Sequence, residues 1–134
     1  MSSLSAFLHP EQAANREVIV SERFKENGKP VPFIIRPITQ KENEGLIRKH
    51  TKKNKKGEEF FDRVAYNHEL AAAAVVEPDL DNAELQKAYG VLGAPSLLEK
   101  MLYIGEFANL FQAIQELSGL DADINDDIDD AKNE

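Results

Sequence analysis

Two short apolar runs separated by a turn signal characterise the first forty residues. Residues 18–20 and 33–35 are apolar and rich in Val and Ile, and Asn27-Gly28 lies between them. Asn-Gly suits a two-residue turn in which both central residues have a positive φ, and β-branched residues are typical of strands. The pattern therefore predicts a β-hairpin that pairs about residues 17–25 with 31–37.

Three prolines flank or interrupt the second of these strands. Pro30, Pro32 and Pro37 have no backbone N–H and so cannot donate a hydrogen bond to a neighbouring strand. The second strand is therefore expected to lie at an edge of the sheet or to carry a bulge.

From Thr39 onwards the apolar positions recur at the spacing of an α-helix, and polar residues mark where each helix begins. Thr39 with Glu42 forms a capping-box pattern, which predicts a helix to about Lys49. A second helix is expected over residues 58–76. Its apolar side consists of Phe61, Val64, Ala65, His68, Ala71, Ala72 and Val75.

The C-terminal part of the helical region contains two further helices. Asp81 with Glu84 predicts the start of one, which ends at Gly90 or Gly93. The other is expected over residues 96–117, with a break or kink between Tyr103 and Glu106, because a glycine at position 105 disfavours a helix interior.

Strands followed by helices, without an internal repeat, indicate an α+β fold: an N-terminal β-hairpin packed on four to five helices. With 134 residues, of which 42% are hydrophobic, the chain can form a single domain. We expect this domain to cover residues 1–120, with the hairpin at about 17–37 and the helical part at about 39–118. Residues 1–14 would form a short apolar arm that contains Leu4, Phe7 and Leu8.

Negative charge is concentrated at the C-terminal end. Six Asp, one Glu and one Lys in residues 121–134 account for −6 of the formal net charge of −8. Such a composition predicts a disordered, solvated tail. Part of it resembles a calcium-binding loop, but Asp126 stands where that loop needs glycine and Lys132 where it needs glutamate, which favours the solvated tail.

The final helix has an apolar side that is wider than one core requires. Ile104, Phe107, Ala108, Leu110, Phe111, Ile114 and Leu117 cover more than half of its circumference. Either the hairpin and the preceding helix cover both sides, or part of the surface receives an amphipathic partner segment or a second copy of the chain. In the second case the partner-binding residues would be Leu102, Tyr103, Phe107, Leu110, Phe111 and Ile114.

A basic run precedes the second predicted helix. It consists of Arg48, Lys49, Lys52, Lys53, Lys55 and Lys56. Repulsion between like charges predicts a mobile, solvated loop. Contact with nucleic-acid phosphates is the less favoured interpretation, because the run itself contains no aromatic residue for stacking. Weak pairing with the acidic tail of the same chain or of a neighbouring copy is a third interpretation.

Residues suited to catalysis or to metal binding form no recognisable pattern. His9, His50 and His68 lack metal-binding spacing, and His68 is expected to be a hydrogen-bonded core histidine. The chain has no cysteine, no nucleophile elbow and no phosphate-binding loop. The sequence therefore does not indicate an enzyme, a cofactor or a metal, although a pair of carboxylates distant in sequence stays open.

Membrane segments are not indicated either. No run approaches the roughly 20 apolar residues that span a bilayer, and the N-terminal residues lack the basic and apolar parts of a signal peptide. We therefore expect a soluble protein that stays in the compartment where it is made.

In the order of its elements and in many short segments, the chain resembles the XkdN-like family of phage tail assembly chaperones, found in tailed phages and in PBSX-like prophages of Gram-positive bacteria. The resemblance extends over nearly the whole chain. Its segments are VSERF at 20–24, GKPVPF at 28–33, VVEPDL at 75–80, NAELQ at 82–86, YGV at 89–91, ML at 101–102, GEF at 105–107 and IQE at 114–116, followed by the acidic end.

The resemblance implies a non-enzymatic assembly factor in the cytoplasm of the bacterial host. Members of the family are thought to bind the tape measure protein, to assist assembly of the tail tube, with the tube protein as a further partner, and to be absent from the mature virion. No catalytic, cofactor-binding or metal residues are implied, nor a small-molecule substrate. The alternatives are a structural tail component retained in the virion and a nucleic-acid-binding regulator that uses residues 48–56.

Overall fold

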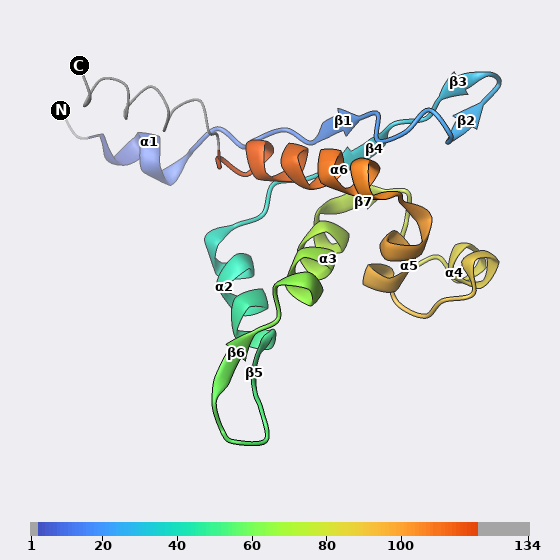
Figure 1. Cartoon of the computed structure of the whole chain (residues 1–134). Helices are drawn as coiled ribbons and strands as arrows, with labels where there is room; N and C mark the ends of the chain where they lie inside the picture. The colour runs from blue at the N-terminus through green and yellow to red at the C-terminus, as the bar shows by residue number, and fades with distance from the viewer. Residues whose placement is uncertain (1–2, 121–134) are drawn as a thin grey trace, which may run out of the picture.

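Two helices, α3 (Arg63–Ala74) and α6 (Ile104–Leu117), pack with a small antiparallel sheet in the computed structural model, which describes residues 3–120 (Figure 1). The other helices are α1 (Leu4–Leu8), α2 (Gln40–Lys49), α4 (Ala83–Tyr89) and α5 (Ala94–Met101). The strands are β1 (Arg16–Val18), β2 (Lys25–Glu26), β3 (Lys29–Pro30), β4 (Phe33–Ile35), β5 (Thr51–Lys53), β6 (Glu59–Phe61) and β7 (Val75–Glu77). The predicted α+β class is confirmed.

The predicted N-terminal hairpin is present, with a short two-stranded tip. β1 pairs with β4, and beyond them β2 pairs with β3 around the Asn27-Gly28 turn. Asn27 has a φ of 54° and Gly28 a φ of 78°, so both central residues have the positive φ of a type I′ turn. The turn chemistry read from the sequence thus accounts for the reversal of the chain.

β4 occupies the centre of the sheet rather than an edge. The strand order is β1-β4-β7, and β4 is antiparallel to both neighbours. The expectation of an edge strand was wrong because Pro32 and Pro37 lie just outside the three paired residues of β4, where their missing N–H groups cost nothing. The alternative expectation, a bulge, agrees with the register shift between Ile34 and Ile35 opposite β7.

The helix expected over 58–76 is shorter and has a strand at each end. α3 begins after Asp62, whose side chain accepts a hydrogen bond from the backbone N–H of Ala65, and it ends at Ala74. Phe61 therefore belongs to β6 instead of the helix. The residues after Ala74 pair with β4, and Pro78 disfavours a helical conformation in the residue before it.

The residues that begin the other helices lie close to the predicted ones. Thr39 and Glu42 form the expected capping box of α2. Asn82, one residue after the predicted Asp81, is the N-cap of α4, and Gly90 ends that helix in a left-handed conformation. α5 begins at Ala94, two residues before the predicted start.

The basic run has regular secondary structure where a loop without it was expected: it forms the end of α2 and part of a β-hairpin. Arg48 and Lys49 end α2, and the lysines that follow lie on β5 and in the turn to β6. The side-chain oxygen of Asn54 accepts hydrogen bonds from the N–H groups of Lys56 (2.9 Å) and Glu58 (3.0 Å). This local hydrogen bonding compensates for the repulsion between the lysines.

The hydrophobic core joins the sheet to α3, α5 and α6. Leu110 and Ile114 of α6 are 0% and 1% exposed, and Ile35 of β4 is 0% exposed. Ala71 and Ala74 of α3 are fully buried, and their small side chains allow close packing of the neighbouring elements. The remaining buried hydrophobic residues are Val20, Phe33, Leu70, Leu80, Leu97, Leu98, Met101 and Leu102.

The break in the C-terminal helical region lies at Leu102 and Tyr103, immediately before the predicted position. Gly105 is inside the first turn of α6 and does not interrupt it. The Glu106 carboxylate accepts a hydrogen bond from the N–H of Tyr103 at 2.8 Å, which fixes the start of α6. Arg23 donates to the same carboxylate at 2.6 and 3.0 Å and to the carbonyl oxygen of Met101 at 2.9 Å.

The start of α2 has the same arrangement. Arg36 donates to both oxygens of Glu42, at 3.1 and 2.7 Å, and the N–H of Thr39 donates to Glu42 at 3.1 Å. The hydrogen bond from Arg36 lowers the pKa of Glu42 from 4.5 to about 2. At α6 the hydrogen bond from Arg23 likewise lowers the pKa of Glu106 from 4.5 to about 2.

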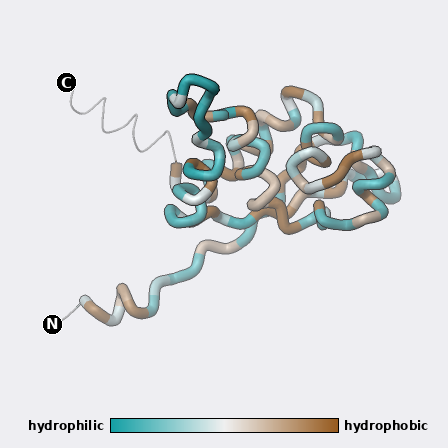
Figure 2. The backbone as a smooth tube through the Cα atoms, turned by 90° about the horizontal axis from the view of Figure 1, so that it is seen from below, coloured by the Kyte–Doolittle hydropathy of each residue, from teal (hydrophilic) through white to brown (hydrophobic). Residues whose placement is uncertain are grey.

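The N-terminal arm extends away from the rest of the described chain (Figure 2). It contains the short helix α1, and Phe7 is 79% exposed there. The predicted acidic tail, residues 121–134, lies outside the described residues, as does the segment that resembles a calcium loop.

Core packing of α6 predicts a clear difference between two truncations on this helix. Leu110→Ala removes a fully buried side chain and should lower the free energy of unfolding by about 2–5 kcal/mol. Ile104→Ala, at a position that is 91% exposed, should change it by less than about 0.5 kcal/mol. Urea unfolding followed by circular dichroism measures both, and equal losses would contradict this assignment of the two faces.

The paired carboxylates predict acid sensitivity. Because the folded pKa values of Glu42 and Glu106 lie below the unfolded value of 4.5, their contribution to stability is fully present above pH 4.5 and is lost as the pH falls towards about 2. The Glu42→Gln/Glu106→Gln variant should therefore lose less stability than the wild type over this range, measured by urea midpoints. Replacing Arg23 and Arg36 by Met should have the same effect. If the urea midpoint of that variant fell with pH as steeply as in the wild type, the arginines would be excluded as the cause.

Candidate partner-binding surface

A groove runs between α3 and α6 and contains two hollows, here called the α3–α6 groove. The larger hollow has a volume of about 390 Å³ and lies towards the C-terminal end of α6. It is lined by Ile38, Thr39, Gln40, Asn43, Arg63, Tyr66, Asn67, Leu70, Phe111, Ile114, Gln115, Ser118 and Leu120. Three helices and the segment before α2 therefore contribute to it.

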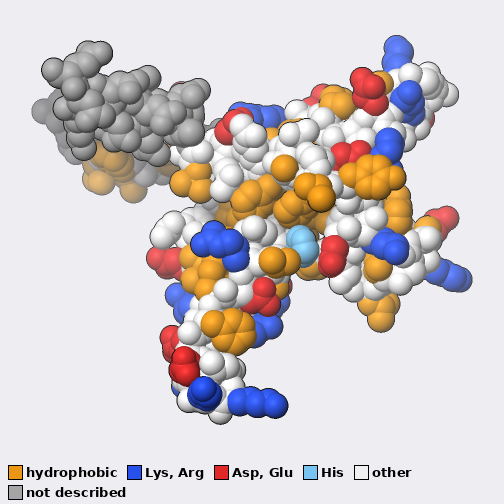
Figure 3. Space-filling view, viewed as in Figure 1, with side chains coloured by type: hydrophobic (Ala, Val, Ile, Leu, Met, Phe, Trp, Pro, Cys, Tyr) orange, Lys and Arg blue, Asp and Glu red, His pale blue; other side chains and the backbone are white. Residues whose placement is uncertain are grey.

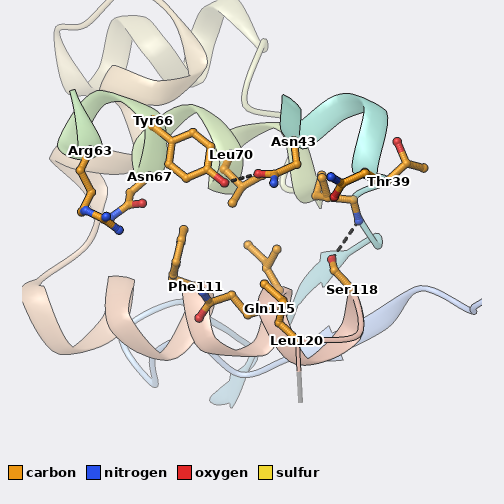
Figure 4. Close-up of a pocket in the computed structure, with 13 residues that line it drawn as sticks. Thr39, Asn43, Arg63, Tyr66, Asn67, Leu70, Phe111, Gln115, Ser118 and Leu120 are labelled. Carbon is orange, nitrogen blue, oxygen red and sulfur yellow. Dashed lines mark hydrogen bonds between the residues drawn. The ribbon is translucent and has the colours of Figure 1, made fainter. Parts of the chain in front are cut away.

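The walls of this hollow are partly polar. Arg63, Tyr66 and Asn67 on α3 face Phe111 and Gln115 on α6 (Figure 4). The hydroxyl of Tyr66 donates to the side-chain oxygen of Asn43 on α2, and partial burial raises the pKa of Tyr66. This hydrogen bond fixes one wall of the hollow.

The smaller hollow, of about 250 Å³, lies at the other end of the groove. It is lined by His68, Leu98, Glu99, Leu102, Tyr103, Ile104 and Phe107. Phe107 connects the two hollows, because its ring stacks on Phe111 with a centroid separation of 6.0 Å and meets the edge of His68 at 5.3 Å. Figure 3 shows hydrophobic side chains gathered along this face between α3 and α6.

The residues predicted to bind a partner divide into two groups. Leu110 and Ile114 are 0% and 1% exposed and Leu102 is 8% exposed, so these three belong to the core, and only Ile114 and Leu102 also line the hollows. Tyr103 is 69% exposed, and Phe107 and Phe111 are half-buried in the groove. The accessible part of the predicted set therefore consists of these three aromatic residues.

Several residues of the groove were not in the predicted set. Ile104 is 91% exposed beside the smaller hollow, and its position on the apolar side of α6 was the only sequence signal for it. Arg63 and Tyr66 line the opposite wall, and no local pattern could indicate them, because the pairing of α3 with α6 is a tertiary contact.

A separate, mainly apolar hollow of about 370 Å³ lies among the N-terminal hairpin, the residues after β7, and α4. It is lined by Phe24, Val31, Pro32, Phe33, Glu77, Pro78, Leu85, Tyr89 and Met101. Val31, at its rim, is 41% exposed. An apolar segment could bind in this hollow as well.

Four of the six predicted basic residues, Lys52, Lys53, Lys55 and Lys56, lie on the projecting hairpin, which we call the β5–β6 hairpin (residues 51–61), while Arg48 and Lys49 end α2. Lys49 bonds to Glu69 of α3 with an Nζ–Oε1 distance of 2.7 Å. Lys52 lies opposite Phe60 in the strand register, and Phe60 is 47% exposed. The structure thus places an exposed aromatic ring beside the lysines, although the basic run itself contains none.

The histidines lie differently from the prediction. His68 is not a core residue, since its side chain is 22% exposed, and its Nδ1 lies 3.9 Å from Glu99 Oε2. His50 is the buried histidine, with its Nε2 at 3.3 Å from Glu69 Oε1. Within residues 3–120, no group of three or more His, Asp or Glu residues could hold a metal ion.

A search of the same described residues for membrane spans finds no helix with the length and hydrophobicity needed to cross a bilayer.

Comparison with known proteins identifies relatives over most of the chain. The chain is 29% identical over 128 residues to the phage-like element PBSX protein XkdN of Bacillus subtilis (strain 168), an alignment that covers 91% of this chain and 86% of that protein. It is 31% identical over 128 residues, with the same coverage, to the uncharacterized protein YqbN of the same organism. The crystal structure of YqbN superposes with a TM-score of 0.76 and 28% identity, covering 90% of this chain and 99% of that one.

The sequence model of a family described as phage XkdN-like tail assembly chaperone protein (TAC) matches residues 4–132. This match agrees with the resemblance found in the short segments of the sequence. Since it extends over nearly the full length, the chain belongs to the XkdN-like family of phage tail assembly chaperones.

Proposed function

We propose that this chaperone binds apolar segments of the tape measure protein in the α3–α6 groove and so assists assembly of the tail tube. Membership of the tail assembly chaperone family implies binding to other tail proteins. The observation that carries the proposal is an accessible apolar path along α6, from Ile104 through Phe107 to Phe111.

The groove suits a helical partner. Ile104, Phe107 and Phe111 are separated by three and four residues, which puts them on one side of α6. Along α6, from Ile104 to Leu117, the groove spans about 20 Å at a rise of about 1.5 Å per residue, enough for three to four turns of a partner helix. Recognition by such a surface follows the helix-in-groove mode, in which apolar anchors supply affinity.

Charge would support the same role. A tape measure protein with a long apolar face tends to aggregate until its partners cover it. The chaperone has a formal net charge of −8, so a complex that covers the apolar face would also gain charge that keeps it in solution.

The proposed role is non-enzymatic and is carried out in the host cytoplasm, with the tail tube protein as a further partner and self-association as an option. The alternatives are a structural component retained in the virion and a nucleic-acid-binding regulator that uses the β5–β6 hairpin. In the proposed role the chain is absent from finished tails. Mass spectrometry of purified tails should therefore detect the tube and tape measure proteins but not this chain, and a stoichiometric amount would favour a structural component.

A matched pair of variants tests the binding surface. Ile104 and Leu92 are each 91% exposed, but only Ile104 borders the groove. Ile104→Asp should reduce the soluble fraction of co-expressed tape measure protein several-fold, because it places a charge in the apolar path. Leu92→Asp should leave that fraction at the wild-type level, and both variants should keep the wild-type melting temperature.

The hollow beside the N-terminal hairpin is the alternative binding site for the tape measure protein. Val31→Asp changes its rim without changing the α3–α6 groove. If Val31→Asp lowered tape measure solubility and Ile104→Asp did not, the binding site would be assigned to the hollow near β4 instead.

A further inference from the structure

The β5–β6 hairpin is exposed over almost its entire length. Every residue from 52 to 61 is exposed, and the two strands pair only with each other (Figure 1). Isolated two-stranded hairpins are marginally stable in water. A segment that covers one face of the hairpin would therefore stabilise it.

The surface of the hairpin is basic and partly aromatic. Residues 51–61 contain four Lys and two Glu, and Arg48 and Lys49 precede them at the end of α2. Four of the lysines lie on β5 and in the turn, and Phe60 faces outward opposite Lys52. A ligand for this surface should be an acidic segment with a few apolar side chains.

The chain carries one segment of that composition, residues 121–134. Its formal charge is −6, from six Asp, one Glu and one Lys, and it contains Ile124 and Ile128 among its aspartates. We propose that residues 121–134 bind the β5–β6 hairpin of the same molecule, with their carboxylates beside the lysines and the isoleucines against Phe60. The proposal does not depend on the binding of the tape measure protein.

The position of Leu120, the residue before segment 121–134, favours binding within one molecule. Leu120 lines the larger hollow together with Gln40, where α2 begins, and α2 leads directly to the hairpin over about 15 Å. Fourteen extended residues reach up to about 46 Å, so the segment can cover the hairpin.

A basic and aromatic surface lies between Leu120 and the β5–β6 hairpin. Arg63 lines the same hollow as Leu120, and its guanidinium lies 5.7 Å from the ring centroid of Phe61 on β6. The ring of Phe61 in turn lies 5.1 Å from that of Tyr66. An acidic segment leaving Leu120 therefore meets a positive charge before it reaches the lysines. A short tether also gives the segment of the same molecule a higher effective concentration than that of a second copy.

A spin label can report this contact in the full chain. The chain contains no cysteine, so Asn125→Cys provides a unique labelling site. In low salt, the label should broaden the amide NMR signals of residues 51–61 strongly and those of the β2–β3 tip, residues 25–30, little. At about 1 M salt, where the screening length is about 3 Å, the broadening of residues 51–61 should fall to the level of the tip. Equal broadening of the two hairpins in low salt would overturn the proposal.

Charge variants provide the matched control. Replacing Lys52, Lys53, Lys55 and Lys56 by Gln should abolish the broadening of the β5–β6 hairpin in low salt. Replacing Lys25 and Lys29 by Gln, on the other exposed hairpin, should leave it unchanged. Broadening that persists in the fourfold variant would contradict binding through the lysines.

A mixing experiment separates binding within one molecule from binding between copies. A mixture of isotope-labelled chain without spin label and spin-labelled chain without isotope should show no broadening at residues 51–61. If the mixture showed broadening as large as that of the chain that carries both labels, the intramolecular proposal would be overturned. The contact would then be assigned to a second copy.

Discussion

Leu110 and Ile114 place α6 against the sheet and against α3 at the same time, because both side chains enter the core that Ile35, Ala71 and Ala74 share. α5 joins the same core, and β1 of the sheet contacts α6. The helices and strands that meet at this core are short, and single helices or hairpins of this length are marginally stable in water. The burial of one side of α6 therefore holds together the sheet, α3 and the corner between α5 and α6.

The same packing determines what α6 presents to the solvent. Once Leu110 and Ile114 face inward, Phe107 and Phe111 must lie at the boundary with α3, where they are half-buried and form the floor of the groove. The groove is thus formed mainly by side chains of helices that the core holds in place. A binding surface of this kind is pre-organised, so less conformational entropy is lost when a partner binds.

Local signals in the sequence predicted the local features well. The Asn27-Gly28 turn and the capping box of Thr39 with Glu42 depend on neighbouring residues only, and both are present. The strand β7 and the β5–β6 hairpin were missed, because their residues acquire strand conformation through pairing with distant segments or through the turn at Asn54. For the site, the sequence identified the apolar side of α6. It could not separate buried Leu110 from half-buried Phe111, since that depends on where α3 lies.

Arg23 joins residues that are far apart in the chain. It lies before the tip of the N-terminal hairpin, yet its partners are the carbonyl of Met101 and the carboxylate of Glu106, 78 and 83 residues later. Contacts of high sequence separation slow folding, because forming them costs the entropy of closing a long loop. During synthesis the hairpin leaves the ribosome long before α6 does, so it must wait for its partner helix. The packing that Arg23 completes is therefore possible only after the residues of α6 have been translated.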